Sequence, residues 1–333
     1  MSEFTSILKR VSDGQTLNEE DAHAAFGEIM AGAISPVRIA AFLTALAVRK
    51  PTVEEITGAA RAMRGAMRNV DAPDGAIDVC GTGGDGHSTL NVSTAVAFVV
   101  AACGVAVAKH GNRSASSLTG AADVLEVLGV PVKLEAEAAS AALRENNFAF
   151  LFAQLYHPAM KHVGPVRAEL GFRTIFNILG PICNPAGVKR QLIGVFSPEW
   201  IEKMANVLAA LGTEKAFIVH GADGLDEISL GGPTHVAILE NGKITQTQIT
   251  PEDAGLSRSP LSAIKGGDAV ENAAAIRALF DGKKNAFRDI VLLNAAAALM
   301  IADKAKDLKS GVALAASAID SGKAKETLAR AAQ

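Results

Sequence analysis

The chain has 333 residues, of which 49% are hydrophobic and 20% charged, which suits one large or two ordinary globular domains with a substantial core. Its net charge of −3 disfavours a general nucleic-acid-binding surface. Cys80, Cys103 and Cys183 lie far apart without a CxxC spacing, which is typical of buried thiols in a reducing cytosol. The N-terminus MSEFTSILKR lacks the apolar core of a signal peptide, so we expect a cytoplasmic protein.

Residues 1–70 are expected to form a small helical domain. Thr16–Glu19 and Thr52–Glu55 have the form of capping boxes, and Ser35-Pro36 is typical of a helix start. Apolar residues recur at helical spacing, but the domain is too small to bury all of them by itself. We therefore expect a second copy of the chain to cover the rest, which predicts a homodimer through this domain.

Residues 71–333 are expected to form a large α/β domain, because strands and helices alternate after the linker 69–75. This pattern predicts a mainly parallel central sheet with helices on both faces. The strands are predicted at about 76–80, 105–108, 131–134, 149–152, 192–196 and 216–220, with a hairpin of 235–239 and 244–249, and the later helices at about 269–281, 285–303 and 307–332. The stretch 157–187 interrupts the alternation, and we expect about 165–185 to pack onto the N-terminal helices.

One run resembles a membrane span. Residues 86–108 carry no Asp, Glu, Lys or Arg, but they include His, Ser, Thr and Asn and much alanine. A lipid-facing helix is more apolar than this. We interpret the run as a buried helix that ends near Gly104 and a following strand, and expect no membrane association.

The sequence GTGGDG at 81–86 follows the first strand and precedes a helix, which is how α/β proteins build phosphate sites. Gly81, Gly83 and Gly86 match the dinucleotide fingerprint GxGxxG, but Asp85 would repel a pyrophosphate there. The next strand also ends in Lys109-His110 rather than in the acid that binds a ribose. A Walker A loop is excluded because no GK[ST] follows, and a purely structural turn stays an alternative.

Two further loops favour a binding site. KHGNRSASS (109–117) follows the next strand, and its cations, amide and hydroxyls suit a second anion. Both loops should lie at the carboxyl ends of neighbouring parallel strands, which indicates a ligand with two separated phosphates. The acidic LDE (225–227) follows another strand, where carboxylates and a hydroxyl such as that of Ser93 can hold Mg²⁺.

Together GTGGDG, NVST (91–94), KHGNRSASS, RAELGFRT (167–174), LGPICNPA (179–186) and LDE resemble the anthranilate phosphoribosyltransferase family. The resemblance covers essentially the whole chain. It implies a helical domain and an α/β domain with 5-phosphoribosyl 1-diphosphate (PRPP) in the cleft between them. It also implies a homodimer, Mg²⁺ as cofactor and a place in tryptophan biosynthesis.

The resemblance also implies site residues. The PRPP residues are Gly81, Gly84, Asp85, Thr89, Asn91, Val92, Ser93, Thr94, Lys109, His110, Gly111, Asn112, Arg113, Ser114, Ala115, Ser116, Ser117 and Ala121, the last of which is often Ser in the family. Those for anthranilate are Gly81, Asn112 and Arg167, and those for magnesium are Ser93, Asp226 and Glu227.

The implied reaction joins the amine of anthranilate to C1 of PRPP and releases diphosphate. An aniline-type amine is mostly unprotonated at neutral pH and needs no strong base, so no catalytic residue is assigned; His110 is a candidate base, with loop positioning or substrate contact as its alternatives. Two other functions stay open: a pyrimidine nucleoside phosphorylase-like enzyme, and a non-catalytic nucleic-acid-binding relative of the same fold.

Overall fold

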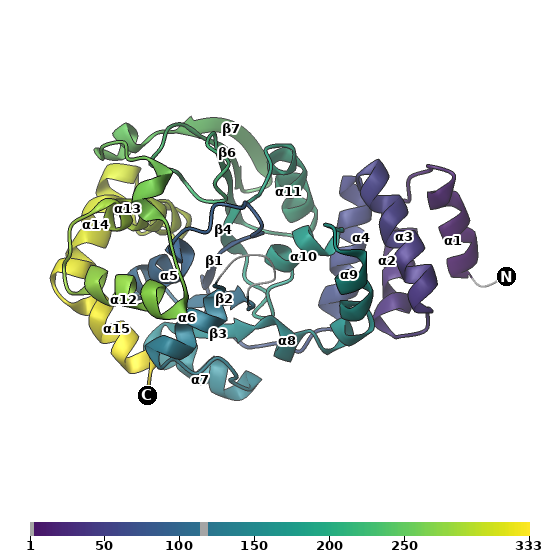
Figure 1. Ribbon diagram of the computed structural model, residues 1–333, viewed down its shortest axis with the longest axis horizontal. Helices are drawn as coiled ribbons and strands as arrows, with labels where there is room; N and C mark the ends of the chain where they lie inside the picture. Colours follow the sequence, from purple (N-terminus) through teal and green to yellow (C-terminus); the bar gives the residue numbers. More distant parts are fainter. Residues whose placement is uncertain (1–2, 114–118) are drawn as a thin grey trace.

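The computed structural model describes residues 3–113 and 119–333. The chain begins with helices α1 (Glu3–Ser12), α2 (Glu19–Met30), α3 (Pro36–Arg49) and α4 (Val53–Gly65). Figure 1 shows these helices side by side at one end of the molecule, with the N-terminus beyond α1. An α/β layer forms the remainder.

The central sheet has seven strands in the order β3-β2-β1-β4-β5-β6-β7 within the described residues. The strands are β1 (Ile77–Gly81), β2 (Val107–Gly111), β3 (Phe148–Phe152), β4 (Arg190–Gly194), β5 (Lys215–Gly221), β6 (Thr234–Glu240) and β7 (Lys243–Ile249). Pairing is parallel from β3 to β5, and β6 and β7 are antiparallel. The predicted mainly parallel sheet is confirmed.

Helices follow or separate the strands. They are α5 (Val92–Ala102), α6 (Ala121–Leu128), α7 (Ala136–Asn146), α8 (Ala153–Tyr156), α9 (Gly164–Leu170), α10 (Phe176–Ile182), α11 (Glu199–Ala210), α12 (Ala269–Phe280), α13 (Ala286–Ile301), α14 (Leu308–Asp320) and α15 (Lys323–Ala331). Short 3₁₀ helices span η1 (Pro158–His162), η2 (Pro251–Ala254) and η3 (Leu261–Ile264). Figure 1 shows α12 to α15 gathered at the end of the molecule opposite α1.

Successive strand residues point to opposite sides of a sheet, and β1 to β5 are buried at almost every position, so both faces are covered there, whereas the edge strand β7 is mostly exposed. In β5, Phe217 and Val219 join a core with α5, α12 and α13, whereas Ala216 and Ile218 join a core on the other face. That second core continues through α11 and α10 into α2, α3 and α4. The sheet and the N-terminal helices therefore share apolar packing.

The segment around α9 and α10 lies between the sheet and the N-terminal helices. α9 packs on α3 and α10 packs on α4. Phe176 of α10 meets Phe26 of α2 edge to face, with ring centroids 5.8 Å apart. The extent of the two domains, 1–70 and 71–333, stays a prediction.

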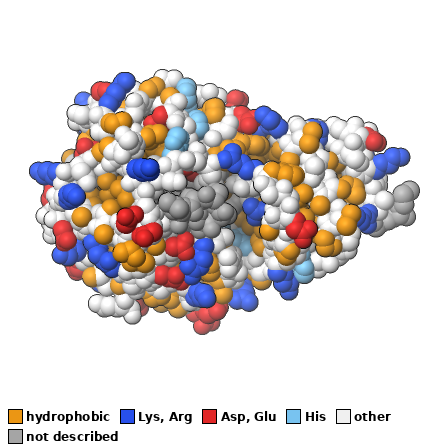
Figure 2. Space-filling view, in the orientation of Figure 1, with side chains coloured by type: hydrophobic (Ala, Val, Ile, Leu, Met, Phe, Trp, Pro, Cys, Tyr) orange, Lys and Arg blue, Asp and Glu red, His pale blue; other side chains and the backbone are white. Residues whose placement is uncertain are grey.

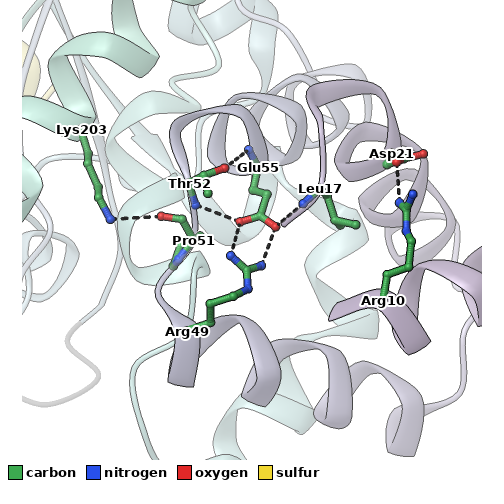
Figure 3. A network of polar contacts seen from close by, with 8 residues as sticks. All are labelled: Arg10, Leu17, Asp21, Arg49, Pro51, Thr52, Glu55 and Lys203. Carbon is green, nitrogen blue, oxygen red and sulfur yellow. Dashed lines mark hydrogen bonds and ion pairs between the residues drawn. The ribbon is translucent and has the colours of Figure 1, made fainter. Parts of the chain in front are cut away.

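A buried carboxylate fixes the turn between α3 and α4 (Figure 3). Glu55 accepts hydrogen bonds from the backbone N–H groups of Leu17 (2.8 Å) and Thr52 (2.9 Å), and Arg49 pairs with both of its oxygens. Thr52 receives the N–H of Glu55 in return, which completes the predicted capping box. Lys203 of α11 donates to the Pro51 carbonyl and ties this turn to the α/β layer.

Three sequence predictions were wrong. The helix α2 has Asn18 as its N-cap, and the Asn18 side chain accepts the N–H of Asp21, so the predicted capping box at Thr16–Glu19 does not form. Residues 131–134 form no strand, because Pro131 offers no N–H and β3 ends the sheet on that side. The helix predicted at 307–332 is divided into α14 and α15 at Gly322, whose φ of +80° breaks the helix.

Neither a nucleic-acid-binding surface nor a membrane association was expected from the sequence, and the surface charge and the helix lengths relate to these two expectations. Figure 2 shows Lys and Arg side chains scattered over the visible face rather than gathered in one patch. Among the described residues, no helix is long and apolar enough to cross a membrane.

Candidate active site

The predicted phosphate loops begin at the ends of β1 and β2, which are parallel neighbours. Gly81 ends β1 and Gly111 ends β2, so both loops lie at the same edge of the sheet. This juxtaposition agrees with the expected placement of two anion-binding turns at carboxyl ends of strands.

The glycine loop depends on left-handed backbone. Gly83, Gly84 and Gly86 have φ values of +66°, +77° and +82°, which side chains rarely adopt. The N–H of Gly83 donates to Asp226 Oδ2 at 2.8 Å, and that carboxylate lies where a Cβ on Gly81 would be. The carboxylate of Asp85 accepts the N–H of His87 at 3.1 Å.

Lys109 lies beneath the start of α5. Its side chain is buried, and Nζ donates to the Val79 carbonyl at 2.8 Å and to Ser93 Oγ at 3.1 Å. Burial lowers the pKa of Lys109, and the negative charge of Asp78 opposes this shift. Lys109 thus belongs to β2 rather than to the turn predicted after the strand, and its cation meets the hydroxyl at the start of α5.

The start of α5 is polar and contacts the chain on more than one side. Asn91 is the N-cap residue of α5, but its side chain accepts the Asn272 amide at 2.8 Å instead of a helix N–H, and Thr89 forms a β-bridge with Lys265. Val92 is buried. The buried Thr94 hydroxyl has no hydrogen-bond partner within the described residues.

Arg113 is engaged by acids of α6. Its guanidinium contacts Asp123 at 2.6 Å and Glu126 at 2.5 Å, and these carboxylates raise its pKa. Asn112 is exposed and accepts the N–H of Arg113, and Ala121 is the first residue of α6. The predicted residues Ser114, Ala115, Ser116 and Ser117 lie outside the described residues.

Asp226 and Glu227 face the glycine loop. Burial and then the charge of Asp85 raise the pKa of Asp226, and burial and then the charge of Asp226 raise that of Glu227. A Cβ on Gly194, at the end of β4, would overlap the backbone carbonyl of Asp226, so this loop packs directly on the strand. Within the part of the chain that the structure describes, no three His, Cys, Asp or Glu side chains converge to hold a metal alone.

This donor set fits magnesium. Asp226, Glu227 and Ser93 offer only oxygens, and the charges of Asp226 and Asp85 raise the pKa of Glu227, a repulsion that a bound cation would relieve. Magnesium is usually held through one or two carboxylates and phosphate oxygens, which agrees with a site that is incomplete without a phosphate ligand.

Two buried histidines, His110 of β2 and His157, lie next to each other. The rings of His110 and His157 are 5.1 Å apart, and His110 Nδ1 lies 3.1 Å from the Gly180 carbonyl oxygen. Burial lowers the pKa of His110 to about 3 and that of His157 to about 4, so both imidazoles are neutral at pH 7. His110 is therefore a weak base.

Arg167 comes from α9. Its guanidinium lies 5.5 Å from the centre of the Phe176 ring, and burial lowers its pKa. Over the described residues, no hydrogen bond joins Arg167 to Gly81 or Asn112. The predicted residues for anthranilate are thus not joined by hydrogen bonds within the described residues.

The comparisons with known proteins cover both parts of the chain. The helical bundle domain of a glycosyl transferase family matches residues 5–67, and the a/b domain of a glycosyl transferase family matches residues 73–325. Anthranilate phosphoribosyltransferases of Beijerinckia indica and Rhodopseudomonas palustris are each 54% identical, over 99% and 98% of this chain and 96% and 97% of theirs. The chain belongs to the anthranilate phosphoribosyltransferase family.

Solved structures of the family agree. The Thermus thermophilus anthranilate phosphoribosyltransferase superposes with a TM-score of 0.92 at 48% identity, covering 98% of both chains. The Saccharomyces cerevisiae enzyme in complex with PRPP and Mg gives 0.90 at 31% identity, covering 98% of this chain and 96% of that one. Family membership favours the predicted phosphoribosyl transfer to anthranilate over a pyrimidine nucleoside phosphorylase-like activity and over a non-catalytic nucleic-acid-binding function.

Sequence reasoning missed several residues that shape this anthranilate phosphoribosyltransferase-family site. Asp78 is a fully buried acid in β1, and its position in an apolar strand was an available signal. It accepts the N–H of His110 at 3.2 Å and the Asn184 side-chain amide at 2.7 Å. The sequence did not indicate the contacts of Gly194 with Asp226 or of Arg173 with Gly84, because the partners are distant along the chain.

Proposed function

We propose that the chain transfers the 5-phosphoribosyl group of PRPP to the amine of anthranilate, giving N-(5-phosphoribosyl)anthranilate and diphosphate in tryptophan biosynthesis. The observation that carries this proposal is the meeting of the glycine loop, the Lys109 turn and the acidic loop at one edge of the sheet. Relatives of the same name support it over the full length of the chain.

PRPP would lie between the two loops. Amide groups of the glycine loop and the cation of Lys109 suit its diphosphate, with donors from the α5 start between the phosphates. The full proposed set is Gly81, Gly84, Asp85, Thr89, Asn91, Val92, Ser93, Thr94, 109–117 and Ala121. Ala121 offers a methyl group and no hydroxyl there.

Magnesium would be held by Ser93, Asp226 and Glu227, and the Saccharomyces cerevisiae complex with PRPP and Mg supports this cofactor. When bound, Mg²⁺ offsets charge that grows on the departing diphosphate. The carboxylate of Asp226 also holds the Gly83 amide, so the acidic loop positions the glycine loop.

Anthranilate would be bound by Arg167, Asn112 and Gly81, and a Saccharomyces cerevisiae relative in complex with 4-fluoroanthranilate supports this substrate class. The guanidinium suits a carboxylate through two parallel hydrogen bonds. A bond then forms between the amine nitrogen and C1 of the ribose as the bond from C1 to diphosphate breaks, and the proton of the amine passes to the released diphosphate or to water.

His110 would position the second turn rather than remove that proton. Its lowered pKa leaves a neutral ring at pH 7, and its main-chain N–H is held by Asp78. C1 develops oxocarbenium character in such reactions, so leaving-group stabilisation and alignment contribute most to catalysis.

A cytoplasmic homodimer is the proposed assembly. Val37 and Val48 of α3 are 79% and 82% exposed, and with Ala41 they lie along one face of that helix. An exposed apolar stripe of this kind is typical of a protein interface. We also propose 1–70, with about 165–185 packed on it, as the small domain and 71–333 as the PRPP-binding domain.

The decisive assay mixes the protein with PRPP, Mg²⁺ and anthranilate and follows the loss of anthranilate fluorescence. Turnover that depends on all three is the expected result. Folded protein that leaves anthranilate unchanged would refute the proposed function.

A further inference from the structure

Arg173 reaches from the segment between α9 and α10 to the glycine loop. One of its terminal nitrogens donates a hydrogen bond to the carbonyl of Gly84. A Cβ on Gly84 would lie 3.3 Å from that nitrogen, so the absence of a side chain permits the approach. Arg173 itself is exposed.

The guanidinium of Arg173 also lies on an aromatic ring. Its central carbon is 4.2 Å from the centre of the Phe196 ring, a favourable cation–π distance. Phe196 in turn contacts Trp200 of α11 edge to face, with centroids 6.2 Å apart. The guanidinium of Arg173 thus lies over the ring of Phe196, and one of its nitrogens donates to the Gly84 carbonyl.

Phe196 is joined to the glycine loop from the other side. Its N–H donates to Thr82 Oγ1 at 3.0 Å, and the N–H of Thr82 donates to the Gly194 carbonyl at 2.9 Å. Arg173 therefore closes a ring of contacts that runs from the β4 end to Thr82, through the loop to Gly84, and back to Phe196.

This ring fixes a peptide group that would otherwise rotate easily. Gly84 has a φ of +77° and no side chain, so the Gly84–Asp85 peptide has little of its own to hold it. In a trans peptide the C=O and N–H point in opposite directions. Holding the Gly84 carbonyl on Arg173 therefore sets the direction of the Asp85 N–H, a loop amide of the proposed diphosphate grip.

We propose that Arg173 is a positioning residue for PRPP: it holds the glycine loop in the conformation that binds the diphosphate. The inference rests on the proposed function, because it takes the glycine loop as the diphosphate site. Arg167, six residues earlier, is proposed to bind anthranilate, so the same segment would serve both substrates.

An arginine is needed in this place. A planar guanidinium can stack on Phe196 with its face and donate to Gly84 in its plane, whereas a lysine ammonium cannot stack in this way. Arg173→Lys should therefore behave more like Arg173→Ala than like the wild type, and Phe196→Leu should give a smaller loss in the same direction.

The test measures binding of PRPP with Mg²⁺ by calorimetry, and separately binding of inorganic diphosphate with Mg²⁺. Arg173→Ala should weaken both by about tenfold or more, as for loss of a hydrogen bond from a charged group. It should raise KM for PRPP far more than KM for anthranilate, and speed hydrogen exchange of the amides at 82–87. Arg277→Ala is the matched control, because Arg277 is exposed and also donates to a carbonyl, that of Val127, away from the loop.

Wild-type affinity for PRPP in Arg173→Ala, an equal rise in both KM values, or a loss shared by Arg277→Ala would overturn the proposal. If Arg173→Ala does not fold, the same measurements on Arg173→Lys and Phe196→Leu decide it. A wild type that binds PRPP but does not turn over refutes the proposed function alone, since the calorimetric comparison still tests Arg173.

Discussion

The side-chain amide of Asn184 donates a 2.7 Å hydrogen bond to the carboxylate of Asp78, and both residues are buried. The same amide donates to the Ala108 carbonyl at 2.8 Å, while Asn184 Oδ1 accepts the N–H of Ala186. This one side chain joins the segment after α10 to β1 and β2, next to the Lys109 turn. Burial raises the pKa of Asp78 to about 6, and the charge of Lys109, the Asn184 amide and the N–H of His110 oppose this rise.

Asn184→Ala should destabilise the protein by about 3 kcal/mol, because it leaves a buried carboxylate and a carbonyl short of donors. Urea unfolding at pH 7.5 measures the change. Asn206→Ala is the control, since Asn206 donates to the Glu202 carbonyl at an exposed site and its loss should cost less than about 0.5 kcal/mol. Equal losses in the two variants would contradict the role of Asn184.

The pair Asp226→Asn and Glu227→Gln tests the magnesium site. Together these changes should raise the Mg²⁺ concentration for half-maximal activity by about tenfold or more, because the carboxylate ligands lose their charge. The measurement is a Mg²⁺ titration at saturating PRPP and anthranilate. Asp281→Asn, whose carboxylate pairs with Lys325 at the surface, should leave the titration unchanged. An unaltered Mg²⁺ requirement in the double variant would exclude these residues as ligands.

His157 should make the native state sensitive to acid. Its pKa is lowered from 6.5 to about 4, so the unfolded chain binds a proton between these values that the folded chain does not. Stability from this group is thus present at pH 7.5 and lost as the pH falls through 6.5 towards 4. His157→Gln removes this dependence.

Urea unfolding of both proteins at pH 7.5 and pH 5 measures the effect. The stability of the wild type relative to His157→Gln should fall by about 2 kcal/mol between these pH values. A difference that stays constant with pH would show that His157 is readily protonated in the folded protein.

If the exposed apolar face of α3 forms the proposed dimer interface, acidic substitutions on this face should separate the dimer. Val37→Asp together with Val48→Asp should convert a dimer into a monomer, because two unpaired charges would be buried in the interface. Light scattering coupled to size-exclusion chromatography gives the mass. Val270→Asp, at an equally apolar position of α12 that is 63% exposed, should leave the mass unchanged. A double variant that is still dimeric would place the interface elsewhere.

The sequence predicted the parts of this protein whose cause is local. The glycines of 81–86, the caps at Thr52 and Ser35, and the alternation of strands and helices were all readable because turn and cap chemistry acts over a few residues. Residues 131–134 were misread because their apolar alternation satisfies packing without a neighbouring strand. The division at Gly322 was missed since a single glycine does not always end a helix.

The contacts across the site could not be predicted in this way. Asp78 meets Asn184 over 106 residues of sequence, and Arg173 meets Gly84 over 89. Such pairs depend on where β1 and the segment around α10 come to lie in space. Only the chemical type of the loops, basic or acidic or glycine-rich, was available from the sequence.

The apolar core that runs from α2 through α10 and α11 to the inner face of β4 and β5 has a consequence for dissecting the chain. A cut after residue 70 would divide this core and expose Phe26 on one piece and Phe176 on the other. Neither fragment should be a self-sufficient folding unit, although the two could recover the native form by fragment complementation. The N-terminal helices therefore depend for their stability on an apolar core that they share with the sheet.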